Sequence, residues 1–354
     1  MVDISEIKVE GWERVVRGVD PDAGLHGIVA VHDTTLGPAL GGLRMWPYAS
    51  EDEALVDVMR LSRGMTYKSA LAQTGLGGGK AVIIGNASTD KSPALFHAMG
   101  KLIDSLGGKY ITAEDVGIGI EDLDHVRETT KWVSGLSIEN GGSGNPSPYT
   151  AHGTFVGLKA CLEEVWGSAD FSGKTFAVQG IGAVAKPLCE AIRKEGGVVV
   201  AADVNEKNLQ WVRDHLDGTE IVEPNSIYDV DCDVFVPCAL GAVLNDATIP
   251  RLKAKAVGGC ANNQLGEERH AAMLQEKEIL YAPDYVINAG GIINVSCEFE
   301  PGGYQESSAM PKIENIYHAL KEVFAKARED GITTSEAADR VAERRISEGQ
   351  KVRE

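Results

Sequence analysis

Two lysines flank a glycine-rich stretch in the first quarter of the chain. Lys68 ends the segment Gly64-Met65-Thr66-Tyr67-Lys68, and Lys80 ends the segment Gly75-Leu76-Gly77-Gly78-Gly79-Lys80. Glycines let the backbone come close to a ligand, and a lysine on each side offers two ammonium groups to one small anion. We therefore expect a glycine turn that holds an anionic substrate between the two lysines, beside a nucleotide cofactor bound further along the chain.

A carboxylate follows a short predicted strand in the same part of the chain. Residues 110–113, Tyr-Ile-Thr-Ala, read as a strand, and Glu114-Asp115 come directly after it. The apolar residues 81–84 read as a second strand, which Lys80 opens. Lys80 and Asp115 can therefore meet at one edge of a sheet, although the sequence does not determine the strand order.

The elements around these residues follow from hydrophobic spacing and from breakers. Ser50 and Glu53 form a capping-box pair that predicts the start of the helix carrying Lys68 near its C-terminal end. Residues 25–33 are short, apolar and β-branched, as in a strand, and the glycines and proline of residues 37–42 are expected to break it. A further helix is expected at about 93–105.

A second glycine motif indicates a nucleotide site. The predicted strand 175–179 runs into Gly180-Ile181-Gly182-Ala183-Val184-Ala185, which has the form G-x-G-x-x-G/A and is followed by a helical pattern. Asp203 stands at the end of the next predicted strand, where a carboxylate accepts hydrogen bonds from a ribose 2′-hydroxyl and repels a 2′-phosphate. The motif predicts NAD rather than NADP, the alternative being a glycine-rich turn without a nucleotide.

The second half of the chain alternates between strands and helices. Strands are predicted at 175–179, 198–202, 233–237 and 256–257, a pattern typical of a parallel, doubly wound sheet of the Rossmann type. Residues 140–148 are rich in Gly, Ser, Pro and Asn, which suits a hinge between domains or a plain surface loop. We expect an α/β protein with a substrate and oligomerisation domain at 1–139, a nucleotide-binding domain at 140–334, and a closing helix at 335–354 that packs back on the first domain.

Composition and charge narrow the classes of function. The chain has 354 residues, 43% of them hydrophobic, and lacks an apolar run of the roughly 18 residues that span a bilayer. A net charge of -18 without a basic stripe disfavours nucleic-acid binding. The six cysteines lack the spacing of metal ligands, so we expect reduced thiols and no metal site. The acidic N-terminus does not resemble a signal peptide, which favours the cytoplasm.

Several long motifs identify a family. The chain resembles the amino acid dehydrogenases of the glutamate, leucine, phenylalanine and valine group, and within it most closely the leucine branch. The resemblance covers nearly the whole chain and rests on the two lysine motifs above, together with residues 37–42, Arg44-Met45, 112–117, 237–239, 261–264 and 281–291.

The resemblance implies catalysis in a cleft between the two domains, with one role for each motif. Lys80 would be the catalytic lysine, Asp115 the acid/base carboxylate, and Lys68 the ligand of the substrate α-carboxylate. The remaining substrate contacts would be Leu40, Gly41, Gly42, Met65, Ala113, Ile292 and Val295. The remaining NAD contacts would be Gly180, Gly182, Ala183, Val184, Asp203, Thr150, Cys238, Ala239, Asn262 and Asn288.

Two positions depart from the pattern of the family. The nucleotide turn usually reads Gly-x-Gly-Asn-Val-Gly, whereas Ala183 and Ala185 stand here in place of Asn and the last Gly. Gly79 stands where leucine dehydrogenases often carry alanine, a feature shared with the phenylalanine and glutamate enzymes.

The expected reaction is the reversible oxidative deamination of leucine, valine or isoleucine to the 2-oxo acid, ammonia and NADH. Leu40 replaces the lysine with which glutamate enzymes bind a second carboxylate, so glutamate is disfavoured. An aromatic substrate, phenylalanine or tryptophan, is the alternative. An inactive nucleotide-binding sensor or scaffold is a less favoured one, because Lys68, Lys80 and Asp115 are all present. The resemblance also implies a homo-oligomer, from dimer to octamer.

Overall fold

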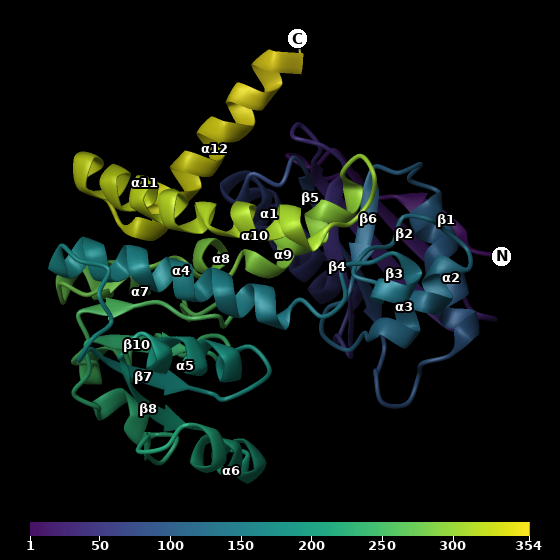
Figure 1. Cartoon of the computed structure of the whole chain (residues 1–354). Helices are drawn as coiled ribbons and strands as arrows, with labels where there is room; N and C mark the ends of the chain where they lie inside the picture. The colour runs from purple at the N-terminus through teal and green to yellow at the C-terminus, as the bar shows by residue number, and fades with distance from the viewer. Residues whose placement is uncertain (354) are drawn as a thin grey trace. The chain divides into compact units, whose positions relative to one another are not determined.

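The computed structural model describes residues 1–353, which fall into two units (Figure 1). Unit 1 comprises Met1–Asn145, Val295–Glu306 and the C-terminal residues from Ala342 on, and unit 2 comprises Pro146–Asn294 and Ser307–Val341. The division after Asn145 lies beyond the boundary expected after residue 139. Residues 295–306, which the sequence analysis placed in the second domain, belong to unit 1, and the closing helix joins unit 1 from Ala342 rather than from residue 335.

Unit 1 is built on a mixed six-stranded sheet with the strand order β1-β2-β3-β5-β4-β6. Strands β1, β2, β3 and β5 pair antiparallel, whereas β4 pairs parallel to both β5 and β6. The strands are β1 Asp3–Glu6, β2 Arg14–Asp20, β3 Leu25–Asp33, β4 Ala39–Trp46, β5 Gly77–Ile84 and β6 Tyr110–Ala113. The helices are α1 Glu51–Ala72, α2 Pro93–Asp104 and α3 Ile120–Arg127, followed by a 3₁₀ turn, Ile138–Asn140.

Alternation along the strands divides the apolar side chains of unit 1 between two faces of the sheet. Ala54 and Val58 of α1 pack with Val15, Ile28, Ala30 and Val82. The larger cluster joins α2 and α3 to the other face and includes Val29, Leu43, Ile83, Phe96, Leu102 and Val126. Figure 1 shows α2 and α3 side by side next to β3. The sheet therefore lies between α1 and the α2–α3 pair.

Two glycine segments that the sequence analysis treated as breaks are strands. The strand expected at 81–84 begins at Gly77, so Lys80 lies inside β5, and residues 39–46 form β4 instead of a turn. The reason is close approach of backbone. A Cβ atom on Gly78 would lie 2.0 Å from the Thr66 backbone nitrogen, and one on Gly77 would lie 2.1 Å from the Asp33 carbonyl oxygen. These glycines let α1 and the loop after β3 contact the strand directly.

Helix α1 begins as its capping residues predict. The Ser50 hydroxyl accepts a hydrogen bond from the Glu53 backbone N–H at 3.2 Å, and the Glu53 carboxylate accepts from the Ala49 N–H at 2.7 Å. The helix then runs for 22 residues. Asp57, Met65 and Lys68 share one face of it because they are separated by multiples of three or four residues.

The later segments of unit 1 are anchored by specific hydrogen bonds. The Glu298 carboxylate, in residues 295–306, accepts bonds from the backbone N–H groups of Ser143 at 2.7 Å and Gly135 at 3.1 Å. In the closing helix the Glu343 carboxylate accepts from the Tyr67 hydroxyl at 2.8 Å, and Arg345 donates to the Leu71 carbonyl at 2.8 Å. Polar groups far apart in the sequence thus complete unit 1.

Unit 2 contains a fully parallel six-stranded sheet with the order β12-β11-β10-β7-β8-β9, which confirms the Rossmann-type prediction. The strand order reverses between β7 and β10, the point where such sheets bind ligands. The strands are β7 Thr175–Gln179, β8 Val198–Ala202, β9 Glu220–Ile221, β10 Val234–Pro237, β11 Ala256–Val257 and β12 Leu280–Tyr281.

The helices of unit 2 lie along and between these strands. Figure 1 shows α4 packed against α11 and near α5. The helices are α4 Ser147–Trp166, α5 Ala185–Lys194, α6 Glu206–His215, α7 His270–Glu276, α8 Asp284–Ile287 and α11 Asn315–Asp330, with 3₁₀ turns at Ser226–Asp229 and Ile249–Arg251. Three helices cross the division between the units along the chain: α9 Gly290–Ser296, α10 Glu306–Ile313 and α12 Thr334–Arg353. A 3₁₀ turn, Cys297–Phe299, follows α9. In the described part of the chain, every helix is too short or too polar to cross a membrane.

Candidate active site

Lys80 and Asp115 form a salt bridge across a strand that separates them. Lys80 lies in β5 and Asp115 follows β6, with β4 between these strands. The Lys80 Nζ nevertheless lies 2.7 Å from Asp115 Oδ2. A Cβ atom on Gly42 of β4 would lie 2.7 Å from the Asp115 Cβ. Any residue other than glycine at position 42 would therefore collide with the Asp115 side chain. Gly42 therefore makes room for the pair.

Burial and neighbouring charges set the protonation of this pair. Lys80 is only 5% exposed, and this burial lowers the pKa of its ammonium group despite the favourable charge of Asp115. The positive charge of Arg44 lowers the pKa of Lys80 further. Burial acts to raise the pKa of Asp115, but the charges of Lys80 and Arg44 outweigh it and lower that pKa. The pair therefore combines a lysine that loses its proton readily with a carboxylate that stays ionised.

Arg44 connects the pair to a second carboxylate. Its Nε donates to Asp115 Oδ2 at 3.1 Å and its Nη1 donates to Asp57 Oδ2 at 2.9 Å. The Tyr48 hydroxyl also donates to Asp57 Oδ2, at 2.7 Å, and the Arg60 Nη2 donates to Asp57 Oδ1 at 2.9 Å. Asp57 thus fixes the guanidinium that lies against Asp115.

No role was predicted from the sequence for Arg44, Asp57 or Tyr48. The side of the sheet on which Arg44 lies could have been predicted, because residues two apart on a strand share a face and Arg44 follows Gly42 by two. Asp57 shares the Lys68 face of α1. Their contact with each other depends on how α1 packs on the sheet, which the spacing within each element does not reveal.

Lys68 and Met65 lie on the part of α1 that covers the glycines of the sheet. A Cβ atom on Gly41 would lie 3.4 Å from the Met65 Cγ, so Met65 packs directly over β4. Gly78 of β5 is in contact with the backbone of Thr66, two residues before Lys68. Because Gly41 and Gly78 have no side chains, this part of α1 lies close to β5, which carries Lys80, and to β4.

The expected side-chain pocket residues lie in different elements. Leu40 is buried, and Gly42 pairs in register with Ala113 of β6, which is half-buried. Val295 is buried in unit 1, whereas Ile292, one turn earlier in α9, is half-buried and belongs to unit 2. The structure thus brings Leu40, Gly41, Gly42 and Ala113 together on adjacent strands β4 and β6.

In unit 2, the glycine motif forms the turn between β7 and α5. Gly180 has a positive φ of 88°, and a Cβ there would lie 2.7 Å from the Ala239 Cβ. At Gly182 an added Cβ would meet nothing within 4 Å, so the backbone is open to a ligand. Helix α5 begins just after Val184 without a side-chain cap, and its Lys186 N–H donates to the Gly182 carbonyl at 3.1 Å, which closes the turn. These features fit the pyrophosphate of a dinucleotide.

Asp203 stands directly beside this turn. Its Oδ2 accepts hydrogen bonds from the Ile181 N–H at 2.6 Å and the Asn208 side chain at 3.1 Å, and its Oδ1 accepts from the Asn205 N–H at 2.7 Å. A carboxylate offers about four acceptor positions, so one remains for a ribose hydroxyl. The carboxylate also supports the turn itself.

The other expected NAD contacts lie in the loops at the ends of the unit 2 strands. Cys238 continues β10, its N–H donating to the Gln179 carbonyl of β7 at 2.8 Å. The buried Asn288 donates to the Asn262 carboxamide oxygen at 2.7 Å and so orients this exposed side chain. Thr150, in the first turn of α4, packs against Gly291, where a Cβ would lie 2.7 Å from its hydroxyl. Ala183 is exposed and Val184 half-buried in the turn.

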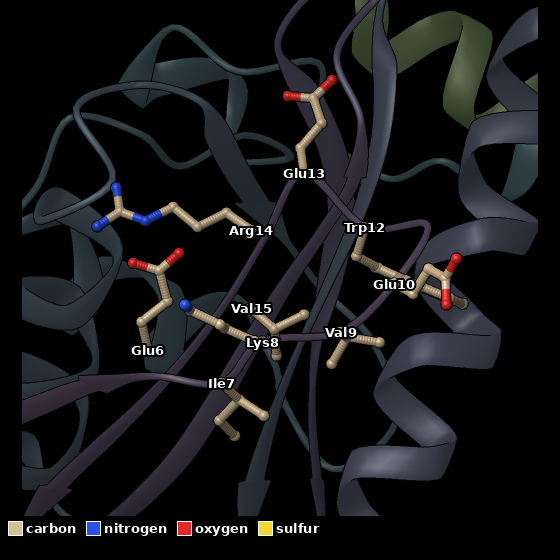
Figure 2. A pocket seen from close by; sticks show the side chains of 9 residues that line it. All are labelled: Glu6, Ile7, Lys8, Val9, Glu10, Trp12, Glu13, Arg14 and Val15. Carbon is tan, nitrogen blue, oxygen red and sulfur yellow. The ribbon is translucent and has the colours of Figure 1, made fainter.

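A shallow cavity near the N-terminus is separate from these groups. It has a volume of about 340 Å³ and is lined by residues 6–10 and 12–15, which join β1 to β2 (Figure 2). All of its lining comes from one continuous segment that contains none of the expected site residues. We assign it no part in the reaction.

A Rossmann-type unit with an open glycine turn, together with a salt bridge between a buried lysine and a half-buried aspartate, fits a nucleotide-dependent dehydrogenase. Residues 13–132 match the family model described as Glu/Leu/Phe/Val dehydrogenase, dimerisation domain, and residues 202–353 match the model of glutamate/leucine/phenylalanine/valine dehydrogenase. The chain belongs to the Glu/Leu/Phe/Val dehydrogenase family. It is an NAD-dependent amino acid dehydrogenase.

Individual relatives have different substrates in their names. The chain is 53% identical to leucine dehydrogenase of Thermoactinomyces intermedius over 342 residues, covering 97% of this chain and 93% of that protein. It is 48% identical to phenylalanine dehydrogenase of Lysinibacillus sphaericus over 350 residues, covering 98% and 91%. The crystal structure of L-tryptophan dehydrogenase from Nostoc punctiforme superimposes with a TM-score of 0.86 at 45% identity, covering 96% of this chain and 97% of that one.

Proposed function

We propose that this enzyme catalyses the reversible oxidative deamination of branched-chain aliphatic L-amino acids, with leucine, valine and isoleucine as substrates. The observation that carries the proposal is the salt bridge between the buried Lys80 of β5 and the half-buried Asp115 after β6, the two neighbours of the strand that carries the apolar Leu40. The 53% identity to a leucine dehydrogenase supports the aliphatic side chain. An apolar wall at Leu40 cannot compensate the desolvation of a second substrate carboxylate.

In substrate binding, Lys68 would act as a permanently charged cation. Its ammonium group would bind the α-carboxylate and so orient Cα for reaction. Leu40, Gly41, Gly42, Met65, Ala113, Ile292 and Val295 would contact the substrate. NAD, when bound, supplies the acceptor for the hydride that leaves Cα. Gly180, Gly182, Ala183, Val184 and Asp203 would hold its pyrophosphate and ribose, and Thr150, Cys238, Ala239, Asn262 and Asn288 would hold the remainder.

The proton steps fall to Asp115 and Lys80. The ionised Asp115 would take a proton from the substrate ammonium group, so that the amine is neutral when the hydride leaves. The neutral form of Lys80, accessible because burial lowers its pKa, would then take a proton from a water molecule as that water attacks the iminium carbon. Asp115 would return its proton to the nitrogen of the carbinolamine. As the C–N bond breaks and ammonia leaves, Asp115 would take the hydroxyl proton and the carbon would become the carbonyl of the 2-oxo acid, after which Asp115 and Lys80 would each release one proton to solvent.

A panel of L-amino acids tests the substrate assignment. With purified enzyme and NAD, NADH formation at alkaline pH should give the highest kcat/KM for leucine, valine or isoleucine. Differences among these three should be small, because one methylene group is worth only about 1 to 3 kcal/mol in an apolar pocket. A flat trace with every amino acid would overturn the proposal.

Aromatic amino acids are the second candidate substrates. Their support is the similarity to a phenylalanine dehydrogenase and to the tryptophan dehydrogenase structure, together with Gly79 in β5. The same panel distinguishes the candidates, since a higher kcat/KM for phenylalanine or tryptophan than for leucine would select the aromatic class.

We also propose a homo-oligomer between dimer and octamer, supported by the match of residues 13–132 to a dimerisation domain. Light scattering on the eluting protein measures its mass against the 37.7 kDa of one chain. A mass of one chain would contradict this. The cytoplasm is the compartment we propose, because all six cysteines are free thiols, as expected in a reducing environment.

A further inference from the structure

Two histidines and a glutamate gather where α2 and α3 meet. The His97 Nε2 of α2 lies 2.9 Å from Glu128 Oε2, and the His125 Nδ1 of α3 lies 3.2 Å from Glu128 Oε1. The two imidazole rings stand 5.8 Å apart between centroids and nearly perpendicular, at 84°. One ligand atom from each residue lies within 4.8 Å of the others. Three metal-binding side chains thus converge on one point.

The helices hold these groups through close backbone contact. A Cβ on Gly100 of α2 would lie 2.1 Å from the Thr129 hydroxyl and 2.6 Å from the Val126 carbonyl oxygen. The Thr129 hydroxyl also donates to the His97 carbonyl at 3.0 Å. Apolar side chains of both helices share the large core cluster on this face of the sheet. The three ligands therefore come from a packed helix pair rather than from a loop.

We propose that His97, His125 and Glu128 bind one divalent transition-metal ion, of which Zn²⁺ is the expected one. Two imidazole nitrogens and one carboxylate oxygen suit zinc, and water can complete a tetrahedral set. With bonds of about 2.0–2.1 Å, the ligand atoms of a tetrahedral site stand roughly 3.3 Å apart. Each imidazole nitrogen lies at about this separation from one oxygen of Glu128, His97 from Oε2 at 2.9 Å and His125 from Oε1 at 3.2 Å, so a small rotation of the carboxylate would present one oxygen to both. The ion would replace the protons that the two imidazoles now share with the carboxylate.

A second group of similar composition lacks these properties. Among residues 1–353, Asp246, Glu267 and His270 also lie close together. Arg269 already donates to the Asp246 carboxylate at 2.7 Å and to Glu267 at 2.9 Å. The His270 Nδ1 accepts a bond from the Glu267 N–H at 2.7 Å, so the proton of the neutral ring is on Nε2, which is the nitrogen nearer Asp246. A bound cation would have to displace both arrangements.

The proposed ion would act on stability. Helices α2 and α3 cover the face of the sheet opposite to α1, which carries Lys68 and Asp57. An ion that binds the folded state alone stabilises it in proportion to the logarithm of its concentration. We expect zinc to join α2 to α3 and to raise the melting temperature while the rate of deamination is unchanged.

Calorimetric titration of the full-length, chelator-treated enzyme with zinc chloride tests this proposal. We expect one ion per chain, and at least about tenfold weaker binding, equal to about 1.4 kcal/mol, in His97→Ala, His125→Ala and Glu128→Gln. The matched control is His26→Ala, which removes a histidine that lies 2.6 Å from a single carboxylate, Glu51. This control should bind zinc as the unaltered enzyme does.

Melting temperatures distinguish a loss of zinc binding from misfolding of a variant. Zinc should raise the melting temperature of the unaltered enzyme and of His26→Ala by the same amount, and that of the exposed Glu128→Gln by less. If the unaltered enzyme does not take up one zinc ion per chain at a free zinc concentration of about 100 μM, the proposal is overturned. Binding within twofold of the unaltered enzyme in the double variant His97→Ala/His125→Ala would also overturn it, because the ion would then lie elsewhere.

Discussion

Lys80 combines a buried position with two charged neighbours of opposite sign. Burial and Arg44 lower its pKa below the ordinary 10.5, while Asp115 acts to raise it. The sequence indicated that Lys80 and Asp115 could meet at one edge of a sheet without determining the strand order, and the salt bridge of 2.7 Å shows that they do. The sequence did not predict Arg44 between Asp115 and Asp57, because that contact depends on packing between α1 and β4 rather than on spacing within either element.

Arg44→Met tests this electrostatic arrangement. Removal of a positive charge that lowers the pKa of Lys80 should raise that pKa, so the alkaline rise of kcat/KM for leucine oxidation should shift to higher pH. Arg60→Met is the matched control, because Arg60 contacts the other oxygen of Asp57. Its profile should not shift. An unshifted Arg44→Met profile would contradict the role of Arg44.

The glycines of β4 and β5 lie in strands, whereas turns were predicted for them. Glycine is usually a breaker, and residues 37–42 and 75–79 were interpreted as turns. Gly42 instead makes room for Asp115, and Gly78 admits the backbone of α1. The helices 51–72 and 93–104 were predicted well because capping residues and apolar spacing determine them locally.

Gly78→Ala should move α1 away from β5. The added Cβ would lie 2.0 Å from the Thr66 backbone nitrogen, which cannot yield without shifting the helix. We expect a loss of about 1–3 kcal/mol in the free energy of unfolding, measured by urea titration, and a raised KM for leucine.

Gly64→Ala provides the matched control on the same helix. Gly64 is exposed, and a Cβ there would meet nothing within 4 Å. Because alanine favours helix, this variant should gain about 0.5–1 kcal/mol of stability. Equal stability of the two variants would contradict the close contact between α1 and β5.

The parallel sheet of unit 2 and the family of the chain could be predicted from the sequence, because alternating elements and long motifs carry that information. The extent of unit 1 could not. Segments 295–306 and the residues from Ala342 on join it through polar contacts such as Glu298 with Ser143 and Glu343 with Tyr67. No periodicity in those segments indicates their distant partners.

Asp203→Asn tests the preference of unit 2 for NAD over NADP. Removing the negative charge should lessen repulsion of a 2′-phosphate, so the ratio of kcat/KM with NAD to that with NADP should fall at least about tenfold. Asp214→Asn, an exposed change in α6, is the control. If the unaltered enzyme uses NADP as well as NAD, the assignment of Asp203 is wrong.

We propose that Lys80 activates the water that attacks the iminium carbon in leucine deamination, while Asp115 exchanges protons with the substrate nitrogen. The most direct measurement compares Lys80→Ala with the unaltered enzyme for kcat with L-leucine and for the dissociation constant of NADH. We expect kcat to fall by several orders of magnitude, since general-base catalysis contributes about 10²–10⁴-fold and activation of water adds to it, with NADH affinity nearly unchanged. A fall of less than about tenfold, or about 1.4 kcal/mol, would contradict the claim.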